Sequence, residues 1–273
     1  MSLSDRVSII TGAGRGIGKA IAKRFAEEGS IVVLVARSLD EVNNTLKEIK
    51  EKDGDGIAIR ADISKINDVN NLVKQVSEKY SKIDILVNNA GVIKPIAPIH
   101  LVKTDEWEDH IKINIFGTFY CIKTVLPYMI SANYGKIINM SGGGAFNAMA
   151  NFSAYGASKA AIVRITEIIA AEVKDHNITA NTIAPGAIKT RITYDIFESA
   201  EMAGIERDRA KEVIEKGGAA LDKVTTLALF LASEESNGLT GKTISAQWDD
   251  LDYIKKNIVE IQKSDKYTMK RMV

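Results

Sequence analysis

Short apolar runs, most of them rich in β-branched residues, alternate along this chain with longer amphipathic stretches. The runs are nearly continuous in hydrophobicity, which is typical of strands that are covered on both faces of a parallel sheet. They predict strands at residues 7–10, 31–36, 56–61, 83–87, 136–140, 178–183 and 242–245. The amphipathic stretches predict helices at residues 17–28, 40–52, 67–80, 104–130, 154–174 and 221–232.

Strands that alternate with helices through short loops indicate right-handed βαβ units, and therefore an α/β fold with a parallel sheet. Ligands of such sheets bind beyond the carboxyl ends of the strands. No linker divides the chain, so we expect one domain over residues 1–248. The pattern loosens after Gly186, where residues 188–218 are expected to form a substrate lid. Residues 249–273 form a charged tail that we expect to be solvated or to pack on the domain.

Composition changes this picture mainly by exclusion. The chain has 273 residues, of which 45% are hydrophobic and 26% charged, and its formal net charge of +1 gives no reason to expect a nucleic acid or a membrane as partner. Its single cysteine, Cys121, lies in an apolar run and is expected to be buried and inert. Together with the lack of a secretory signal pattern, this indicates a reducing cytoplasm. The histidines His100, His110 and His176 lack metal-ligand spacing, so we expect no metal.

A glycine-rich turn follows the first predicted strand and opens the first predicted helix. It reads Thr-Gly-Ala-Gly-Arg-Gly-Ile-Gly over residues 11–18. Glycines let the backbone approach a pyrophosphate, and the helix N-terminus offers unpaired N–H groups to it. The spacing departs from G-x-G-x-x-G, because Ile17 stands at the last position, and it fits T-G-x-x-x-G-x-G instead. We interpret the turn as the phosphate site of a dinucleotide.

Further motifs follow this turn in a fixed order. They are Asp62 after the third strand, the Asn-Asn-Ala-Gly run at 88–91, Asn114, the pair Tyr155 and Lys159, Asn181, and Pro185 and Gly186 with Thr190. In this order and spacing the chain resembles the short-chain dehydrogenase/reductase superfamily, in its short single-domain branch, over roughly residues 4–246. The resemblance implies a Rossmann-type, doubly wound α/β sandwich with a central parallel sheet of about seven strands. It also implies an oxidoreductase that interconverts a carbonyl and a secondary alcohol by hydride transfer with a nicotinamide cofactor.

The resemblance implies a cofactor site that is drawn from several strand ends. Residues 62–63 border the adenine, residues 89–91 line the cofactor cleft, and residues 185–190 face the nicotinamide. The expected cofactor-binding residues are Gly12, Gly14, Arg15, Gly16, Ile17, Arg37, Ser38, Asp62, Ile63, Asn89, Ala90, Gly91, Tyr155, Lys159, Pro185, Gly186, Ile188 and Thr190.

The end of the second predicted strand selects between NAD and NADP. An NAD site usually places a carboxylate there, which accepts a hydrogen bond from the ribose 2′-hydroxyl. This chain has Ala36, Arg37 and Ser38 instead. An arginine grips a 2′-phosphate with two parallel hydrogen bonds, whereas a carboxylate would repel it. Arg15 in the glycine turn offers a second positive group, so we expect NADP(H) to be favoured over NAD(H).

Tyr155 and Lys159 stand four residues apart and project from one helix face. A neighbouring ammonium is expected to lower the tyrosine pKa, which is roughly 10 in a free side chain. The resemblance implies that Tyr155 exchanges a proton with the carbonyl oxygen, and that Lys159 tunes Tyr155 and holds the nicotinamide ribose. It assigns Asn114 to a water-mediated proton relay.

Two features depart from the family pattern. The usual catalytic serine stands thirteen residues before the tyrosine, where this chain has Gly142. We expect Ser141 to take that role, with Ser153 or a backbone N–H as the alternatives. The chain also lacks the common Asp-Gly-Gly after its last strand and continues through Trp248, which either caps the substrate pocket or packs on the chain.

Two other functions compete with carbonyl reduction or alcohol oxidation. One is isomerisation or dehydration through transient hydride transfer, against which the glycine spacing argues. The other is a catalytically silent NADP-binding sensor or scaffold, which the displaced serine favours and the retained Tyr155, Lys159 and Asn114 oppose. The substrate is expected to be a small carbonyl or alcohol compound. Residues 188–218 mix apolar and charged positions that suit sugars, acyl thioesters, steroids or small ketones.

Oligomerisation is also expected. The predicted helices at 104–130 and 154–174 carry apolar residues on more than one face, which is more than a single sheet contact needs. In the family the equivalent helices pair across a dimer axis, commonly within a tetramer. The resemblance therefore implies a homodimer or a homotetramer.

Overall fold

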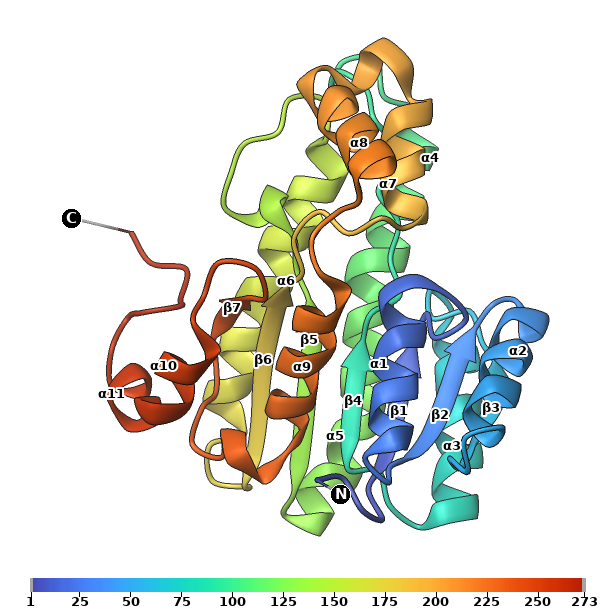
Figure 1. Cartoon of the computed structure of the whole chain (residues 1–273), viewed down its shortest axis with the longest axis vertical. Coiled ribbons are helices and arrows are strands. Elements are labelled where there is room, and N and C mark those ends of the chain that lie inside the picture. Colours follow the sequence, from blue (N-terminus) through green and yellow to red (C-terminus); the bar gives the residue numbers. More distant parts are fainter. Residues whose placement is uncertain (1, 272–273) are drawn as a thin grey trace.

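The computed structural model describes residues 2–271 and contains one seven-stranded sheet (Figure 1). The strands are β1 (Val7–Thr11), β2 (Ile31–Ala36), β3 (Gly56–Arg60), β4 (Ile85–Asn88), β5 (Gly135–Met140), β6 (Ile178–Ala184) and β7 (Thr243–Ser245). Their order across the sheet is β3-β2-β1-β4-β5-β6-β7, and all neighbouring strands are parallel. β1 therefore has β2 on one side and β4 on the other, which is the switch point where doubly wound sheets bind ligands. The predicted Rossmann-type fold is confirmed.

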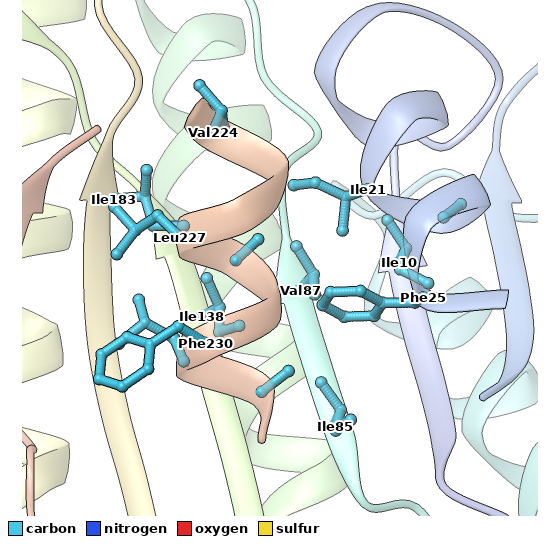
Figure 2. Close-up of a cluster of buried hydrophobic side chains, with 14 of the residues drawn as sticks. Ile10, Ile21, Phe25, Ile85, Val87, Ile138, Ile183, Val224, Leu227 and Phe230 are labelled. Carbon is cyan, nitrogen blue, oxygen red and sulfur yellow. The ribbon is translucent and has the colours of Figure 1, made fainter. Parts of the chain in front are cut away.

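Helices cover both faces of the sheet. One face carries α1 (Gly16–Glu27), α2 (Leu39–Lys50) and α9 (Leu221–Ala232), and the other carries α3 (Ile66–Tyr80), α5 (Gly117–Ala132) and α6 (Ser153–Glu172). Successive strand residues point to opposite faces, so Ile10 belongs to the core under α1 and α9 while Ile9 belongs to the other core. Figure 2 shows the first core, in which Phe25 of α1 lies beside Val87 of the sheet and Leu227 of α9 points toward the strands.

The long apolar helix predicted at 104–130 is interrupted. α4 (Thr104–Ile111) is followed by a π-helical segment, Lys112–Phe116, and then by α5. By length and composition alone the combined run Thr104–Ala132, with a mean hydropathy of 1.3, is long and apolar enough to cross a membrane. In this fold the run packs against α3, α6, β4 and β5. It also contains Cys121, which is buried as expected, and burial raises the pKa of this thiol to about 12.

Beyond β6 the chain forms helices above the sheet and then a packed tail. α7 (Arg191–Glu198) and α8 (Ile205–Lys216) lie together beyond the carboxyl ends of the strands (Figure 1). In the tail, α10 (Leu251–Lys256) and α11 (Ile258–Gln262) bury Ile254 and Ile261 in the same core as α9. The Thr243 N–H of β7 then donates to the Tyr267 carbonyl oxygen (2.8 Å). Trp248 is 86% exposed, so it does not pack on the chain, which was one of the two roles expected for it.

Candidate active site

The glycine turn lies between the ends of β1 and β4, at the switch point of the sheet. Gly12 has a φ of 67°, which favours glycine, and a Cβ at Gly18 would lie 2.3 Å from the Gly12 carbonyl oxygen. Thr11 Oγ1 accepts hydrogen bonds from the N–H groups of Asn89 (3.0 Å) and Ala90 (3.1 Å). These bonds tie the turn to the loop after β4, so the two loops form one wall of the site.

A cavity of about 570 Å³ opens in front of this turn, and its volume lies in the range of ligand sites. It is lined by many of the predicted cofactor residues: Gly12, Gly14, Arg15, Gly16, Ile17, Arg37, Ser38, Asp62, Ile63, Asn89, Ala90, Gly91 and Thr190. The predicted residues outside its lining are Tyr155, Lys159, Pro185, Gly186 and Ile188. The wall fits a dinucleotide, because glycine backbone and a helix N-terminus face the phosphate side and arginines stand beside the end of β2.

Charged side chains gather where β2 ends. Arg37 is exposed there, and its carbonyl oxygen accepts a hydrogen bond from Arg60 Nε (3.2 Å). Arg15 Nη1 forms an ion pair with Glu41 Oε1 (3.1 Å), a carboxylate that the sequence pattern did not indicate. Ser38 Oγ accepts a hydrogen bond from the Glu41 N–H (3.4 Å) and caps α2. Arg15 and Arg37 therefore border this end of the cavity together with the carboxylates of Glu41 and Asp62.

Tyr155 and Lys159 project from α6 toward the end of β5. Lys159 Nζ lies 5.7 Å from the centre of the Tyr155 ring and donates to the Met140 carbonyl oxygen (2.9 Å). A Cβ at Gly91 would lie 3.9 Å from Lys159 Nζ, so the ammonium stands behind the cavity wall that Gly91 forms. A Cβ at Gly142 would lie 2.2 Å from the Tyr155 hydroxyl oxygen. The hydroxyl therefore occupies the space that a side chain at 142 would need.

Burial dominates the pKa values of this pair. Tyr155 as a whole is half-buried, and its hydroxyl lies against the backbone of Gly142. Desolvation raises the pKa of Tyr155 to about 12 and lowers the pKa of Lys159 to about 8. The expectation that the pKa of Tyr155 lies below that of a free tyrosine is wrong for this structure, because burial of the phenol raises it. The hydroxyl keeps its proton at neutral pH, as a proton donor to a carbonyl oxygen must.

The other predicted catalytic residues have different surroundings. Asn114 is buried in the π-helical segment, where Oδ1 accepts from the Val92 N–H and Nδ2 donates to the Val92 carbonyl oxygen, both at 2.9 Å. π-Helical turns often mark functional sites. Ser141 Oγ is buried without a hydrogen-bond partner, and Ser153 Oγ accepts from Trp107 Nε1 (3.2 Å). The choice between the two serines stays a prediction.

The fold also brings to the site residues that the sequence pattern did not indicate. His110, which is 1% exposed, lies between Asn114 and Ser158. Its spacing of four residues from Asn114 was the one signal available. The α7 region lies within the segment 188–218 that was expected to form a lid, and it adds five residues to the cavity lining that were not named as site residues: Lys189, Arg191, Ile192, Tyr194 and Asp195. Within residues 2–271, no group of three or more His, Cys, Asp or Glu side chains is arranged to hold a metal ion.

Doubly wound sheets bind dinucleotides at the place where this cavity lies, and hydride transfer to a carbonyl needs a proton donor beside it. The class is that of NAD(P)-dependent oxidoreductases. The family model for short chain dehydrogenases matches residues 6–201. The chain belongs to the short-chain dehydrogenase/reductase family, and the resemblance seen in the sequence motifs is confirmed.

Similar proteins extend this result to most of the chain. The 3-oxoacyl-(acyl-carrier-protein) reductase FabG of Staphylococcus epidermidis is 35% identical over 243 residues, which cover 88% of this chain and 96% of that protein. The crystal structure of NAD⁺-bound xylitol dehydrogenase matches with a TM-score of 0.84 and 27% identity, over 90% of this chain and 98% of that one. A gluconate 5-dehydrogenase from Burkholderia cenocepacia in complex with NADP and tartrate matches with a TM-score of 0.80 and 28% identity, over 89% and 94%.

Proposed function

We propose that this chain uses NADP(H) to interconvert a ketone and a secondary alcohol, with Tyr155 as proton donor and acceptor. The observation that carries the proposal is the position of the pair: Lys159 Nζ lies 5.7 Å from the centre of the Tyr155 ring and stands behind the Gly91 wall of the cavity. NADPH, when bound, supplies the hydride. Tyr155 gives its proton to the carbonyl oxygen as that oxygen gains charge, and the Lys159 ammonium stabilises the phenolate that remains.

Two neighbouring groups support the proton transfer in this proposal. Lys159 Nζ carries further hydrogens beyond the one it donates to the Met140 carbonyl, and these are free to bind the hydroxyls of the nicotinamide ribose. A Cβ at Gly91 would lie 3.2 Å from Asn114 Oδ1 and 3.9 Å from Lys159 Nζ. Asn114 is therefore close enough to Lys159 to support a relay of protons through water.

Tyr155→Phe tests the catalytic proposal. Turnover should fall by about two to four orders of magnitude, which is typical of a lost general acid. NADPH affinity should stay close to that of the wild type, since the aromatic ring remains. The control is Tyr128→Phe on α5, an exposed tyrosine that should keep full activity. Full turnover by Tyr155→Phe would overturn the mechanism.

The substrate is proposed from the same site and from the named relatives. Residues 188–218 are proposed as a lid of the single domain 1–248, because Ile192 and Tyr194 of α7 line the cavity. A first panel is a 3-oxoacyl thioester, a polyol and a sugar acid, the classes that the names of the relatives indicate. Wild-type protein that turns over none of a wider set of carbonyls and alcohols with either cofactor would contradict the proposal.

NADP(H) is proposed as the preferred cofactor because Arg37 and Arg15 border the cavity where a 2′-phosphate would lie. Arg37→Asp should weaken NADPH binding strongly and spare NADH, since it removes a charge-assisted bond and adds a repulsive carboxylate. Lys65→Asp makes the same change of charge on an exposed residue outside the lining of this cavity and serves as control. Fluorescence titration gives the dissociation constants. Tighter binding of NADH than of NADPH by the wild type would overturn the preference.

We also propose that the chain is a cytoplasmic homodimer or homotetramer that pairs through α5 and α6. Phe116 and Phe119 are each 44% exposed and form a ring cluster with Tyr120, and Ile168 of α6 is 48% exposed. Free Cys121 fits a reducing compartment. Phe119→Glu should lower the mass seen by light scattering at micromolar concentration to that of a monomer. Val259→Glu on α11, which is 69% exposed, should leave the mass unchanged.

A monomeric wild type would sink the proposal of an oligomer. A Phe119→Glu variant that stays oligomeric would show that α5 does not form the interface.

A further inference from the structure

A buried histidine lies at the centre of the polar contacts behind the catalytic side chains. His110 belongs to α4 and stands four residues before Asn114. Its Nδ1 lies 2.8 Å from the Lys94 carbonyl oxygen, and its Nε2 lies 2.8 Å from Asn114 Nδ2 and 3.0 Å from Ser158 Oγ. Its ring meets the Tyr155 ring in a T-shaped arrangement with centroids 6.4 Å apart. One imidazole therefore touches α6, which carries Tyr155 and Lys159, and the π-helical segment, which carries Asn114.

The partners fix which nitrogen of His110 carries the hydrogen. A carbonyl oxygen only accepts, so Nδ1 carries the hydrogen that it donates to Lys94. The Asn114 amide is oriented by the Val92 peptide, whose N–H donates to Oδ1 and whose carbonyl accepts from Nδ2. Asn114 Nδ2 then presents its second N–H to His110 Nε2, which must accept it with a lone pair. His110 is thus a neutral imidazole with its hydrogen on Nδ1.

Ser158 connects this contact to the helix of the catalytic tyrosine. Its hydroxyl donates to the Tyr155 carbonyl oxygen (2.8 Å), and its oxygen lies 3.2 Å from Asn114 Nδ2, where it shares with His110 Nε2 the one amide hydrogen that Val92 does not take. Without an acceptor at His110 Nε2, that shared hydrogen would bind Ser158 Oγ alone, and the Asn114 amide would shift from the contact with His110 (2.8 Å) toward the longer one with Ser158 (3.2 Å). Such a shift would change the bonds on both sides of the Tyr155 and Lys159 pair.

The charge state of His110 matters because only a neutral imidazole can accept the Asn114 hydrogen at Nε2. Burial lowers the pKa of His110 below its ordinary value of 6.5, the hydrogen bond to the Lys94 carbonyl opposes this, and the Lys159 charge lowers the pKa further. Tyr155 and Lys159 are the titratable groups of α6 that face the ring, while the ammonium of Lys94 pairs with Asp195 of α7 (3.5 Å). If Nε2 carried a proton, His110 Nε2–H and Asn114 Nδ2–H would both be donors, and the hydrogen bond between them would be lost.

We propose that His110 is a positioning residue of the reaction: as a neutral acceptor it fixes the Asn114 amide and, through Ser158, the turn of α6 that carries Tyr155. The inference rests on the proposed function, because the effect it assigns to His110 is an effect on proton transfer by Tyr155. A histidine that only fills space would change stability alone. A positioning histidine changes kcat according to whether an acceptor is present.

Two variants separate these roles. His110→Gln keeps an acceptor near the place of Nε2, and His110→Leu keeps a comparable volume without one. We expect His110→Leu to lower kcat by about 10- to 100-fold, the scale of a small misplacement at a reacting group, with little change in KM. His110→Gln should recover most of this loss. The wild-type pH profile should fall on the acid side as Nε2 takes a proton, and His110→Gln should lack that fall.

The outcomes are decisive when stability is measured in parallel. Wild-type kcat in both variants, or equal loss in both with an equal loss of stability, overturns the inference. Tyr155→Phe is assayed alongside. Full turnover by that variant contradicts the proposed function itself. If Tyr155→Phe is inactive and His110→Leu keeps the kcat of the wild type, only the role of His110 is contradicted.

Nitrogen-15 NMR of the imidazoles gives a readout independent of turnover. The signal lost in His110→Gln, with the exposed His100→Gln as control, should belong to a neutral Nδ1–H tautomer at pH 7. An Nε2–H tautomer or a cation at that pH overturns the inference.

Discussion

Replacing Gly142 with alanine tests directly where the Tyr155 hydroxyl lies. Gly142 has a φ of −176°, which is extended backbone that alanine also adopts, so the change adds no backbone strain. It adds one methyl group, whose carbon would stand 2.2 Å from the Tyr155 hydroxyl oxygen and 3.2 Å from Cζ. Since non-bonded atoms settle near about 3.5 Å, the hydroxyl must withdraw by about 1.3 Å. A misplacement of about 1 Å costs about 100-fold in rate, or about 2.7 kcal/mol of transition-state stabilisation.

The assay compares kcat/KM for Gly142→Ala and Gly143→Ala with one carbonyl substrate and NADPH. A Cβ at Gly143 would meet nothing within 4 Å, so this neighbour should keep wild-type activity. Gly142→Ser introduces the same carbon as alanine, so restoring the serine of the family pattern should not raise activity. NADPH affinity and the unfolding midpoint confirm that each variant is folded. Wild-type turnover by Gly142→Ala would refute the reasoning, because the hydroxyl would then lie elsewhere in the working enzyme.

Four further outcomes are expected. Lys159→Ala should lower turnover by about two orders of magnitude and should also lower NADPH affinity, because one ammonium serves both. A loss of turnover alone would show that Lys159 does not bind the nicotinamide ribose. Ser141→Ala should lower turnover with little effect on NADPH binding if that serine orients the carbonyl, and an effect of Ser153→Ala instead would move the role there. Ile261→Ala, at a position that is 0% exposed, should cost about 2–5 kcal/mol in denaturant unfolding, whereas a solvated tail would show no cost. Burial lowers the pKa of Lys136 to about 8, so between about pH 8 and 10 the unfolded chain holds a proton there that the folded chain has lost, and this group makes stability rise with pH. Lys159 adds a rise of the same sign, whereas Cys121, whose pKa burial raises from 9.0, opposes it above about pH 9. Lys136→Met should therefore make the free energy of unfolding rise less between about pH 8 and 9 than it does in the wild type.

The regular elements were predictable because most strands are buried on both faces and leave short, largely apolar runs, as β2 and β4 do. Their ends were less predictable, since pairing sets them: β4 begins at Ile85, which pairs with Ser8 of β1, and not at the apolar residue 83. The π-helical turn around Asn114 was missed. One extra residue in a turn leaves the apolar pattern of a long helix almost unchanged.

In the candidate site, features set by residues close in sequence were predictable, and features set by residues far apart in sequence were not. The glycine turn was predictable because its eight residues form a strand end, a turn and a helix start in sequence. The role of His110 was not, because its partners Lys94 and Ser158 lie 16 and 48 residues away and meet it only in the fold. The pKa of Tyr155 was predicted in the wrong direction, because spacing along a helix reveals a neighbouring charge but not the burial that raises this pKa.

Main-chain acceptors explain how the site keeps its form without the serine of the family pattern. Lys159 Nζ donates to the carbonyl of Met140, the last residue of β5, and Asn114 Nδ2 donates to the carbonyl of Val92, in the loop that follows β4. β4 and β5 are neighbours in the sheet, so both acceptors lie on backbone near the carboxyl ends of paired strands. The position of a backbone carbonyl depends on the strand ladder and not on the side chain next to it. Gly142 therefore leaves these anchors in place, and what its missing side chain changes is the space beside them, which the tyrosine hydroxyl takes.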